Sequence, residues 1–356
     1  MRKSLLIQCI YPARYDLSKF SNGVCHKKGS IFILTLWSLC LLSIFAIGLG
    51  SKVSQEINLA SYFQNKSQAR YLAEAAIKRA QIILKNDTNA FDSLNEFWST
   101  GRYADNEESV FNEVKLGNGV YSIVHTTPDA GSSAQYGMVD EERKININTA
   151  SQDILERLFR IAAGVDIDDA HIIASSIIDW RDTDSNTLEG GAEDSFYKQL
   201  EIPYECKDGN FQVLEELLLV RGMTDEIFLK VKDLVTIYND GKVNINTANQ
   251  QVLCALGMND ALANKIILYR KGNDGIEGTE DDNVLKDSSN IANDLKQGVG
   301  LNEEELNKIV ELTSAGILTV SSKNFFVNAE GKVGRRRERI VCVADKKGVI
   351  KYWREQ

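Results

Sequence analysis

The chain has 356 residues, a net charge of −9 and an ordinary globular composition, with 43% hydrophobic and 26% charged residues. Three prolines exclude a proline-rich linker protein, and six cysteines exclude a disulfide-dense scaffold. The charge is uneven, because residues 1–29 contain six basic residues and one acidic residue. The remainder therefore has 35 basic and 49 acidic residues, a net charge of −14. At about 150 residues per domain, the length predicts two domains.

The first predicted element is a membrane-spanning helix at 30–50, where 21 consecutive residues carry no charge. A bilayer core about 30 Å thick requires roughly 20 apolar residues in a helix. Lys27 and Lys28 precede this segment, so the positive-inside rule predicts a cytoplasmic N-terminus with the acidic bulk across the membrane. An ordinary secretory signal is the alternative, but its apolar core is only about 7–15 residues long.

The helix is predicted to continue to about Leu84, because 51–85 contain no proline. At about 1.5 Å per residue, the whole helix would be a stalk about 80 Å long. Apolar and small residues recur at helical spacing and predict one buried stripe, formed by Ile57, Tyr71, Ala75, Ala76, Ala80 and Ile83.

Lys28-Gly29 followed by Ser30 and an apolar run resembles a type IV prepilin processing site. The resemblance implies that a prepilin peptidase cuts between Gly29 and Ser30 and methylates the new amine of Ser30. Most pilins and pseudopilins carry Glu at the fifth mature position, which here is Leu34. A carboxylate buried among apolar helices is costly unless it is paired. In having Leu34 in place of this Glu, the chain resembles the minor pseudopilin K family of type II secretion systems, which also lacks the Glu.

Two strands are predicted at 110–116 and 120–126, joined at Asn118-Gly119, a strong hairpin signal. Three more are predicted at 325–330, 339–344 and 349–353. Turns are expected at Gly331 and Gly348. A basic run precedes the second of these three strands and indicates either a solvated turn or a contact with an acidic partner; it comprises Arg335, Arg336, Arg337 and Arg339.

The sequence Asn-Ile-Asn-Thr-Ala occurs twice, at 146–150 and 244–248. Each copy predicts a short strand followed by a capped helix, and second helices are expected at 170–180 and 261–270. The arrangement resembles helix-hairpin-helix or SAM-like units of the pseudopilin K family. The predicted hairpins are acidic and would repel a polyanion, so we interpret the repeats as scaffold. Further helices are predicted at 211–219, 224–237 and 302–312.

The resemblance implies an α+β fold in which a pilin-like antiparallel sheet is interrupted by a large all-α inserted domain. We therefore divide the chain into a cleaved leader (1–29), a transmembrane helix (30–50), the stalk with the first part of the pilin-like domain (51–145), the inserted domain (146–314) and the C-terminal strands (315–356).

An acidic segment after the helix at 170–180 has the ligand spacing of an EF-hand loop. Oxygens at alternate positions can wrap one Ca²⁺ ion, although Thr187 replaces the usual glycine. The predicted ligands are Asp182, Asp184, Asn186 and Glu193. A second acidic, glycine-rich stretch at 272–283 offers Asp274, Glu280, Asp281 and Asp282. We expect structural calcium, with a solvated acidic loop as the alternative.

Three cysteines, Cys206, Cys254 and Cys342, lie beyond the leader and the membrane span. An odd number permits one internal bridge at most. Because Cys206 and Cys254 share the predicted inserted domain, they are the preferred disulfide pair. No histidine or cysteine cluster, phosphate-binding loop or nucleophile motif indicates catalysis, so we predict a protein that is not an enzyme.

The resemblance implies a minor pseudopilin that caps the tip of the pseudopilus and helps to initiate its assembly. It also implies a single-pass inner-membrane protein with a periplasmic C-terminal domain. The implied partners are the minor pseudopilins I and J, the prepilin peptidase and the inner-membrane secretion platform, and no nucleic acid. The alternative is a membrane-tethered DNA-uptake protein that uses the paired hairpin units.

Overall fold

The computed structural model describes residues 28–102, 109–125 and 135–356; most of the predicted leader lies outside these ranges. The chain divides into two units that meet between Tyr62 and Phe63. Helix α1 (Lys28–Asn86) runs through both units, which confirms the predicted continuous helix. Among the described residues it is the one helix long and apolar enough to cross a membrane. Its N-terminal part is exposed along 31–60.

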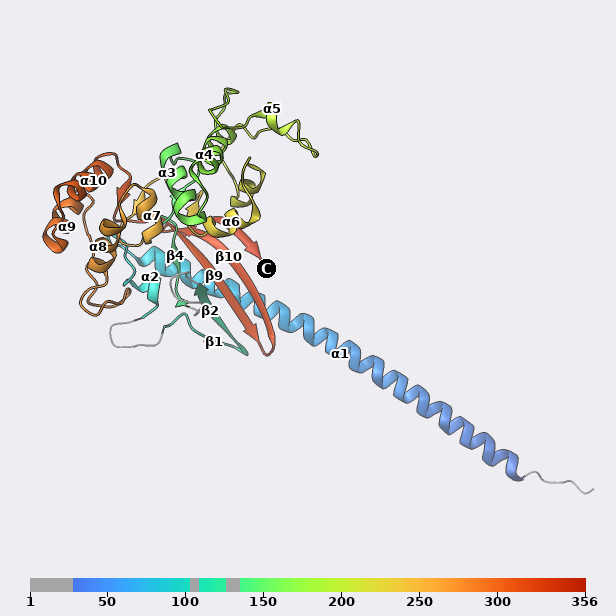
Figure 1. Cartoon of the computed structure of the whole chain (residues 1–356). Helices are drawn as coiled ribbons and strands as arrows, with labels where there is room; N and C mark the ends of the chain where they lie inside the picture. The colour runs from blue at the N-terminus through green and yellow to red at the C-terminus, as the bar shows by residue number, and fades with distance from the viewer. Residues whose placement is uncertain (1–27, 103–108, 126–134) are drawn as a thin grey trace, which may run out of the picture. The chain divides into compact units, whose positions relative to one another are not determined.

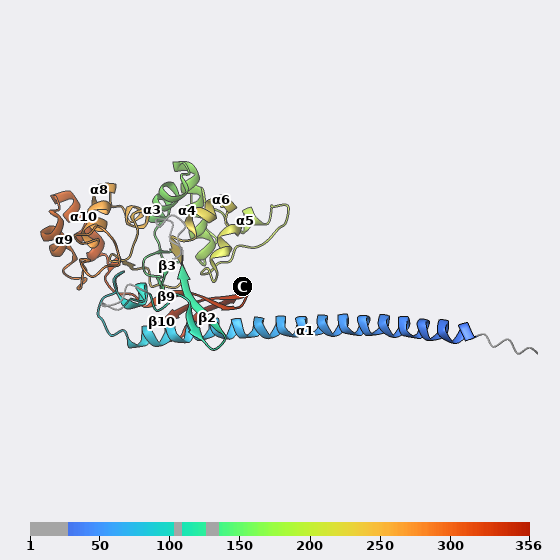
Figure 2. The ribbon, with the colours of Figure 1, turned by 90° about the horizontal axis from the view of Figure 1, so that it is seen from below.

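In the second unit, the remainder of α1 packs against an antiparallel sheet (Figures 1 and 2). The main strand order is β1-β2-β9-β10-β11, while β3 pairs with β2 and β4 pairs with β9. The strands are β1 (Val114–Leu116), β2 (Gly119–His125), β3 (Gln135–Tyr136), β4 (Val139–Asp140), β9 (Asn324–Val333), β10 (Arg336–Asp345) and β11 (Ile350–Glu355). We call this assembly the sheet part. It confirms the predicted hairpin, whose turn is Gly117-Asn118 rather than Asn118-Gly119, and the three C-terminal strands.

The helix lies close to the sheet because its contact face is built from small residues. Ala69, Ala73, Ala76 and Ala80 are completely buried and recur at three- and four-residue intervals. The predicted stripe was correct for Ala76 and Ala80 but wrong for Ile57 and Tyr71, which are 60% and 65% exposed. The true face therefore begins at Ala69 and is rotated from the predicted one.

Gly331 was predicted to form a turn, but it lies inside β9 and faces α1. A Cβ atom at this position would be 1.9 Å from the carbonyl oxygen of Ala69. Only glycine permits so close an approach of the helix backbone to the strand. The glycine marks helix–sheet contact rather than a change of chain direction.

The arginine run also differs from the prediction, because β10 begins at Arg336 and so includes Arg336 and Arg337 as well as Arg339, where the strand was predicted to begin. Only Gly334 and Arg335 form the two-residue loop between β9 and β10. Arg337 lies 3.0 Å and Arg339 3.7 Å from carboxylate oxygens of Glu330 on the neighbouring strand. Cross-strand ion pairs therefore occupy part of the run that was predicted to be a turn.

The residues between β4 and β9, 141–323, form a second hydrophobic core, and we call them the helical insertion. Figure 1 shows α3, α4 and α6 grouped beside α7, α8, α9 and α10. Its elements are β5 (Ile145–Asn146), α3 (Gln152–Leu158), the π-helical turn η2 (Phe159–Ala163), α4 (Ile167–Arg181), α5 (Asp194–Tyr197), the 3-10 turn η3 (Leu214–Leu219), α6 (Asp225–Val231), β6 (Val235–Thr236), β7 (Val243–Asn244), α7 (Gln250–Ala255), α8 (Asp260–Arg270), α9 (Ile291–Val299), α10 (Glu303–Ser314) and β8 (Leu318–Thr319).

The insertion was expected to be an all-α domain, but it also contains short strands, of which β5 and β7 lie where the repeated motif predicted a strand. Two parallel strand pairs, β5 with β6 and β7 with β8, run through it. The helix predicted at 224–237 therefore ends at Val231, and the chain then enters β6. Leu318 and Val320 are buried in the insertion's core. Residues 317–320 thus pack with the insertion rather than with the C-terminal strands to which the sequence assigned them.

The two connections between the sheet part and the helical insertion meet at buried carboxyl groups. Asp140 Oδ2 accepts hydrogen bonds from Ser322 Oγ at 2.7 Å and Thr247 Oγ1 at 2.5 Å. Glu142 accepts hydrogen bonds from the backbone and side-chain nitrogens of Asn324 at 3.0 and 2.8 Å. Burial, followed by the charge of Asp140, raises the pKa of Glu142 to about 8.

A raised carboxyl pKa means that the folded chain binds a proton more tightly than the unfolded chain does. The free energy of unfolding should therefore fall as pH rises from the ordinary value of 4.5 to about 8. Glu142→Gln should flatten this part of the pH profile of denaturant unfolding. Exposed Glu201→Gln is the matched control and should leave the profile unchanged. Parallel profiles for wild type and Glu142→Gln would contradict the assignment.

Candidate metal-binding loop

The acidic loop after α4 brings together three of its four predicted ligands. Ligand oxygens of Asp182, Asp184 and Glu193 all lie within 4.8 Å of one another. Asp182 directly follows α4, and Glu193 directly precedes α5. The backbone N–H of Asn186 donates to Asp184 Oδ1 at 2.7 Å, which holds the loop in a tight bend. The structure therefore forms a cluster of three carboxylates at the place where the spacing predicted a metal site.

These carboxylates are poorly compensated by the surrounding protein. Glu193 is only 4% exposed. Glu193 Oε1 and Asp182 Oδ1 are buried without a hydrogen-bond partner. Burial raises the pKa of Glu193 to about 7, and the charges of Asp179 and Asp182 add to the effect. A divalent cation with oxygen ligands would satisfy both atoms and offset the repulsion, so the residues present fit such an ion.

Asp179 and a Gly-Gly pair determine the path of this loop. The buried carboxylate of Asp179 accepts the backbone N–H of Leu188 at 3.2 and 3.3 Å. A Cβ atom on Gly191 would lie 2.0 Å from Asp179 Oδ2, while Gly190 has a φ of +76°. Arg221 Nη1 donates to the Gly191 carbonyl at 2.9 Å. Sequence reasoning did not assign Asp179 a role, although the adjacent glycines were a signal of close packing.

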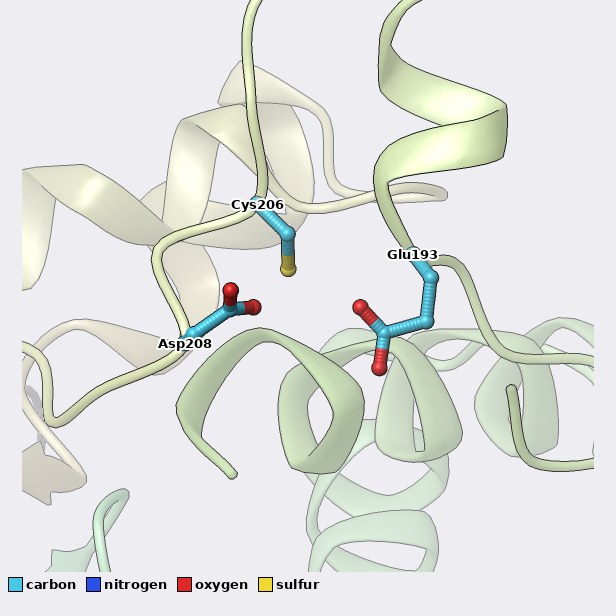
Figure 3. Close-up of side chains that lie close together, drawn as sticks. All are labelled: Glu193, Cys206 and Asp208. Atoms are coloured by element: carbon cyan, nitrogen blue, oxygen red, sulfur yellow. The ribbon is translucent and has the colours of Figure 1, made fainter. Parts of the chain in front are cut away.

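Cys206 and Asp208 were also missed by the sequence prediction. Figure 3 shows the side chains of Glu193, Cys206 and Asp208 directed toward one another. Their ligand atoms lie within 4.8 Å of one another. Burial raises the pKa of the Cys206 thiol to about 12. No spacing rule linked these residues, because Cys206 lies 13 positions beyond Glu193.

The predicted disulfide between Cys206 and Cys254 is wrong in this structure, where both are free buried thiols. Cys206 Sγ is 3.6 Å from the carbonyl oxygen of Asp179. Cys254 Sγ is instead 3.4 Å from Asp260 Oδ1, at the start of α8. The two sulfur atoms therefore have different neighbours, each belonging to its own copy of the repeat. Sharing one inserted domain was not sufficient to bring them together.

The second acidic stretch does not form a comparable group. Asp281 Oδ2 accepts the backbone N–H groups of Asn273 and Asp274 at 2.6 and 3.1 Å. Asp282 Oδ2 accepts from the backbone of Gly278 at 2.7 Å. Hydrogen bonding, first from Thr279, lowers the pKa of Asp281. The loop's own donors thus bind Asp281 and Asp282, two of the four residues that were predicted to bind calcium there.

Another cluster of carboxylates lies near the end of α1, where ligand oxygens of Asp87, Asp92 and Glu96 lie within 4.8 Å of one another. Lys346 Nζ lies 2.9 Å from Asp87 Oδ2 and 2.8 Å from Asp92 Oδ1. The lysine ammonium already offsets this charge. The loop at Asp182 therefore remains the best-supported metal site among the described residues.

The duplicated motif explains how the two acidic loops are held. Asn148 Oδ1 accepts from the backbone N–H of Phe211 at 2.7 Å, and its amide donates to the Phe211 carbonyl at 3.1 Å. In the second copy, Asn246 makes the same two contacts with Leu285 at 3.0 and 2.8 Å. Asn246 thus holds the backbone just beyond the second acidic stretch, whereas Asn148 holds it at Phe211, 18 positions beyond Glu193.

An arginine closes the other end of each loop. Arg270, the last residue of α8, donates to the carbonyls of Ile245 and Ala248 at 2.9 and 2.7 Å. Arg181, the last residue of α4, donates to Ile147 and, at 2.6 Å, to Ala150. Both arginines therefore bind the carbonyls of the repeated Asn-Ile-Asn-Thr-Ala sequence. In each copy the motif is therefore a scaffold that binds the chain once before the acidic stretch and once after it.

Residues 131–240 match the family model described as Type II secretion system (T2SS), protein K. The putative type II secretion system protein K of Escherichia coli K12 is 22% identical over 235 residues, which cover 62% of this chain and 65% of that protein. The type II secretion system protein K of Pectobacterium carotovorum is 24% identical over 185 residues, covering 50% and 51%. The Pseudomonas aeruginosa protein K is 24% identical over 266 residues, covering 72% and 75%. The chain therefore matches about two thirds and about half of the first two relatives' lengths.

The fold is similar to that of a solved structure, the crystal structure of the GspK-GspI-GspJ complex from enterotoxigenic Escherichia coli. The match has a TM-score of 0.56 and 18% sequence identity. It covers 86% of this chain and 99% of the matched chain. At this level of identity, the likeness shows a common fold: a long N-terminal helix on an antiparallel sheet with a helical insertion.

Proposed function

Because the chain belongs to the type II secretion system protein K family, we propose that it is a minor pseudopilin that caps the pseudopilus tip and helps to initiate its assembly. The observation that carries the proposal is one helix that continues from an apolar, exposed segment into a sheet whose strands are separated in sequence by a helical insertion. The role is structural rather than enzymatic. The sheet part would be the pilin-like body, and the insertion would prevent further subunits from joining above it.

The proposed localisation is the bacterial inner membrane, with residues 30–50 inside the bilayer and the second unit in the periplasm. This segment, which carries no charge on any side, would pack among other stalk helices. Leu34 would allow such packing without an unpaired carboxylate in the bilayer. The proposed partners are the minor pseudopilins I and J, as in the solved complex to which the fold is similar.

Co-expression with the minor pseudopilins I and J of the same organism tests the proposed function. The full chain, extracted from membranes in detergent, should co-purify with both partners as one complex of defined stoichiometry. A chain that is well folded and yet stays separate from both partners would overturn the tip assignment. Isolation of the wild-type chain from cells without the prepilin peptidase provides a control for dependence on maturation.

Maturation makes a second, independent prediction. Mass spectrometry of the membrane-extracted protein should find an N-terminus at Ser30 that carries one methyl group. Gly29→Val should leave the leader attached, because the bulkier side chain would obstruct the peptidase. Gly23→Val, also in the leader, should be processed normally. Cleavage near Gly50 would instead identify an ordinary secretory signal.

We further propose that Asp182, Asp184, Asn186 and Glu193 hold one structural calcium ion. The unpartnered buried oxygens of Asp182 and Glu193 support this site. Glu193→Gln should weaken calcium binding by about tenfold or more, because one anionic ligand is lost. Isothermal titration of the full chain in detergent would measure the effect. Glu280→Gln, in the second acidic stretch, is the matched control and should bind as wild type does; an absence of wild-type binding would identify a solvated loop.

The DNA-uptake alternative has one structural observation in its favour. The two hairpins line one open cavity of about 900 Å³, together with Arg157 and Arg160. The same cavity is also lined by Asp166 and Asp168, whose negative charges would repel a phosphate backbone. Titration with fluorescent duplex DNA at low salt should therefore show no binding; salt-sensitive binding would favour the alternative.

A further inference from the structure

Three side chains beside the proposed calcium loop form a group of mixed ligand chemistry. Glu193 precedes α5, whereas Cys206 and Asp208 lie in the irregular segment between α5 and η3 (Figure 3). The Cys206 backbone N–H donates to Asp194 Oδ1 at 2.8 Å. This bond ties the irregular segment to the first residue of α5 and holds Cys206 close to Glu193.

Two observations distinguish this group from a general acidic surface. Glu193 is 4% exposed, and its Oε1 atom has no hydrogen-bond partner. The sulfur atom of Cys206 belongs to a residue that is 7% exposed and lies within 4.8 Å of ligand oxygens of both Glu193 and Asp208. Glu193 Oε1 is thus a buried acceptor without a partner beside a thiol, and a cation placed between them would be a ligand partner for both.

Sulfur changes which cation fits the group. Calcium binds oxygen ligands, whereas Zn²⁺ is bound by cysteine sulfur together with carboxylate oxygens. Thiolate ligands favour softer ions such as Zn²⁺ over Ca²⁺. The group of Glu193, Cys206 and Asp208 therefore has a donor set that the oxygen-only group of Asp182, Asp184 and Glu193 lacks.

We propose that Glu193, Cys206 and Asp208 form a binding site for a thiolate-preferring divalent cation of the Zn²⁺ class. On binding, the S–H bond of Cys206 breaks, a metal–sulfur bond forms, and the proton passes to the solvent. Two carboxylates and one thiolate supply three negative charges. Because Glu193 belongs to both groups, Zn²⁺ in this site and Ca²⁺ at Asp182 compete or bind as neighbours through one shared carboxylate. The site does not depend on the pseudopilin role.

Cys254 provides the matched comparison within the same insertion. It is buried to a similar extent, with 6% exposure, and its sulfur lies 3.4 Å from one carboxylate oxygen of Asp260. Among the described residues, however, no group of three metal ligands includes Cys254. Cys254 is thus a buried thiol with one carboxylate neighbour that lacks the second carboxylate found near Cys206.

Titration of the full chain in detergent with Co²⁺, a spectroscopic substitute for Zn²⁺, tests the proposal. One equivalent should produce the near-ultraviolet charge-transfer absorption of a cobalt–thiolate bond, and Zn²⁺ should remove it by displacement. Cys206→Ser should abolish this absorption, whereas Cys254→Ser should retain it. Binding should release protons and strengthen with rising pH. Absence of the absorption in wild type, or its persistence in Cys206→Ser, would overturn the proposal.

Asp208→Asn provides a second variant that leaves the buried core untouched, because Asp208 is exposed. It should weaken Zn²⁺ binding by at least about tenfold, as expected when one charged ligand is lost. Unchanged Zn²⁺ affinity in this variant would contradict the three-residue site. Calcium titration of Cys206→Ser separates the two metal proposals: retained Ca²⁺ binding together with a missing cobalt–thiolate signal in wild type would refute only the thiolate site.

Discussion

Gly331→Ala is expected to destabilise the second unit by about 3 kcal/mol or more, because overpacking here involves backbone atoms that cannot rotate away. The added Cβ would lie 1.9 Å from the carbonyl oxygen of Ala69 and 2.7 Å from the nitrogen of Ala73. The helix could remain only by moving away from the sheet, which would open the interface along Ala76 and Ala80. Denaturant unfolding of the full chain in detergent, followed by circular dichroism, would measure the loss.

Gly209→Ala is a suitable control for this substitution. A Cβ atom there would meet only the carbonyl oxygen of Lys207, at an ordinary contact distance of 3.8 Å. Its free energy of unfolding should stay within about 0.5 kcal/mol of the wild-type value, as for most surface substitutions. Equal free energies of unfolding for the two variants would contradict the close contact between α1 and β9 at Gly331.

Arg270→Ala should lower the free energy of unfolding by about 3–5 kcal/mol, the usual cost of removing one partner from a buried ionic group. Arg270 is 4% exposed and donates to two carbonyls of the second repeated motif. Its Nη2 atom also lies 2.5 Å from Glu277 Oε1. The substitution would leave three acceptors without this donor and release one end of the second acidic loop. Thermal unfolding of the full chain would detect the loss.

Glu277→Gln separates the ion pair from the two backbone contacts. Because Glu277 is 30% exposed, its neutralisation should cost no more than about 1 kcal/mol. Arg270→Lys keeps the charge but loses the planar fork, so its stability should resemble that of Arg270→Ala. A full loss in Glu277→Gln, with Arg270→Lys remaining stable, would show that charge rather than the fork stabilises the repeat.

The elements specified by neighbouring residues were predicted well. The uncharged run at 30–50 and the proline-free stretch after it are sufficient for one long helix, which the structure confirms. The helix predicted at 302–312 begins as expected: Asn302 Oδ1 accepts the Glu305 N–H at 2.8 Å, and Glu305 accepts the Asn302 N–H at 2.9 Å. Such capping depends on residues three positions apart, so sequence spacing reveals it.

Predictions that depended on partners far along the chain were less accurate. The segment at 224–237 has helical periodicity, but its last residues pair with β5, about 90 positions earlier, and form a strand. The pairing satisfies backbone groups that a longer helix would have satisfied internally. Similarly, Arg337 was expected in a turn, but pairing with β9 extends the strand through it.

The candidate metal site divides in the same way. The spacing of Asp182, Asp184 and Glu193 is local, and the loop folds so that their oxygens meet. The second acidic stretch is also rich in Asp, Glu and Gly, but its Asp281 and Asp282 accept hydrogen bonds from backbone N–H groups of the same loop. Composition therefore could not distinguish a loop with unsatisfied oxygens from one that is internally hydrogen bonded.

The amino-acid sequence by itself determined the long apolar helix, the duplicated motif and the carboxylate spacing, because each can be read from residues close together in the chain. Only the tertiary structure decided that Gly331 faces α1, that Arg270 and Arg181 bind the repeated motif, and that a thiol joins the acidic loop. Each of these depends on the approach of segments distant in sequence. Such contacts form when burial of two hydrophobic cores fixes the chain path, and local pattern carries no information on that path.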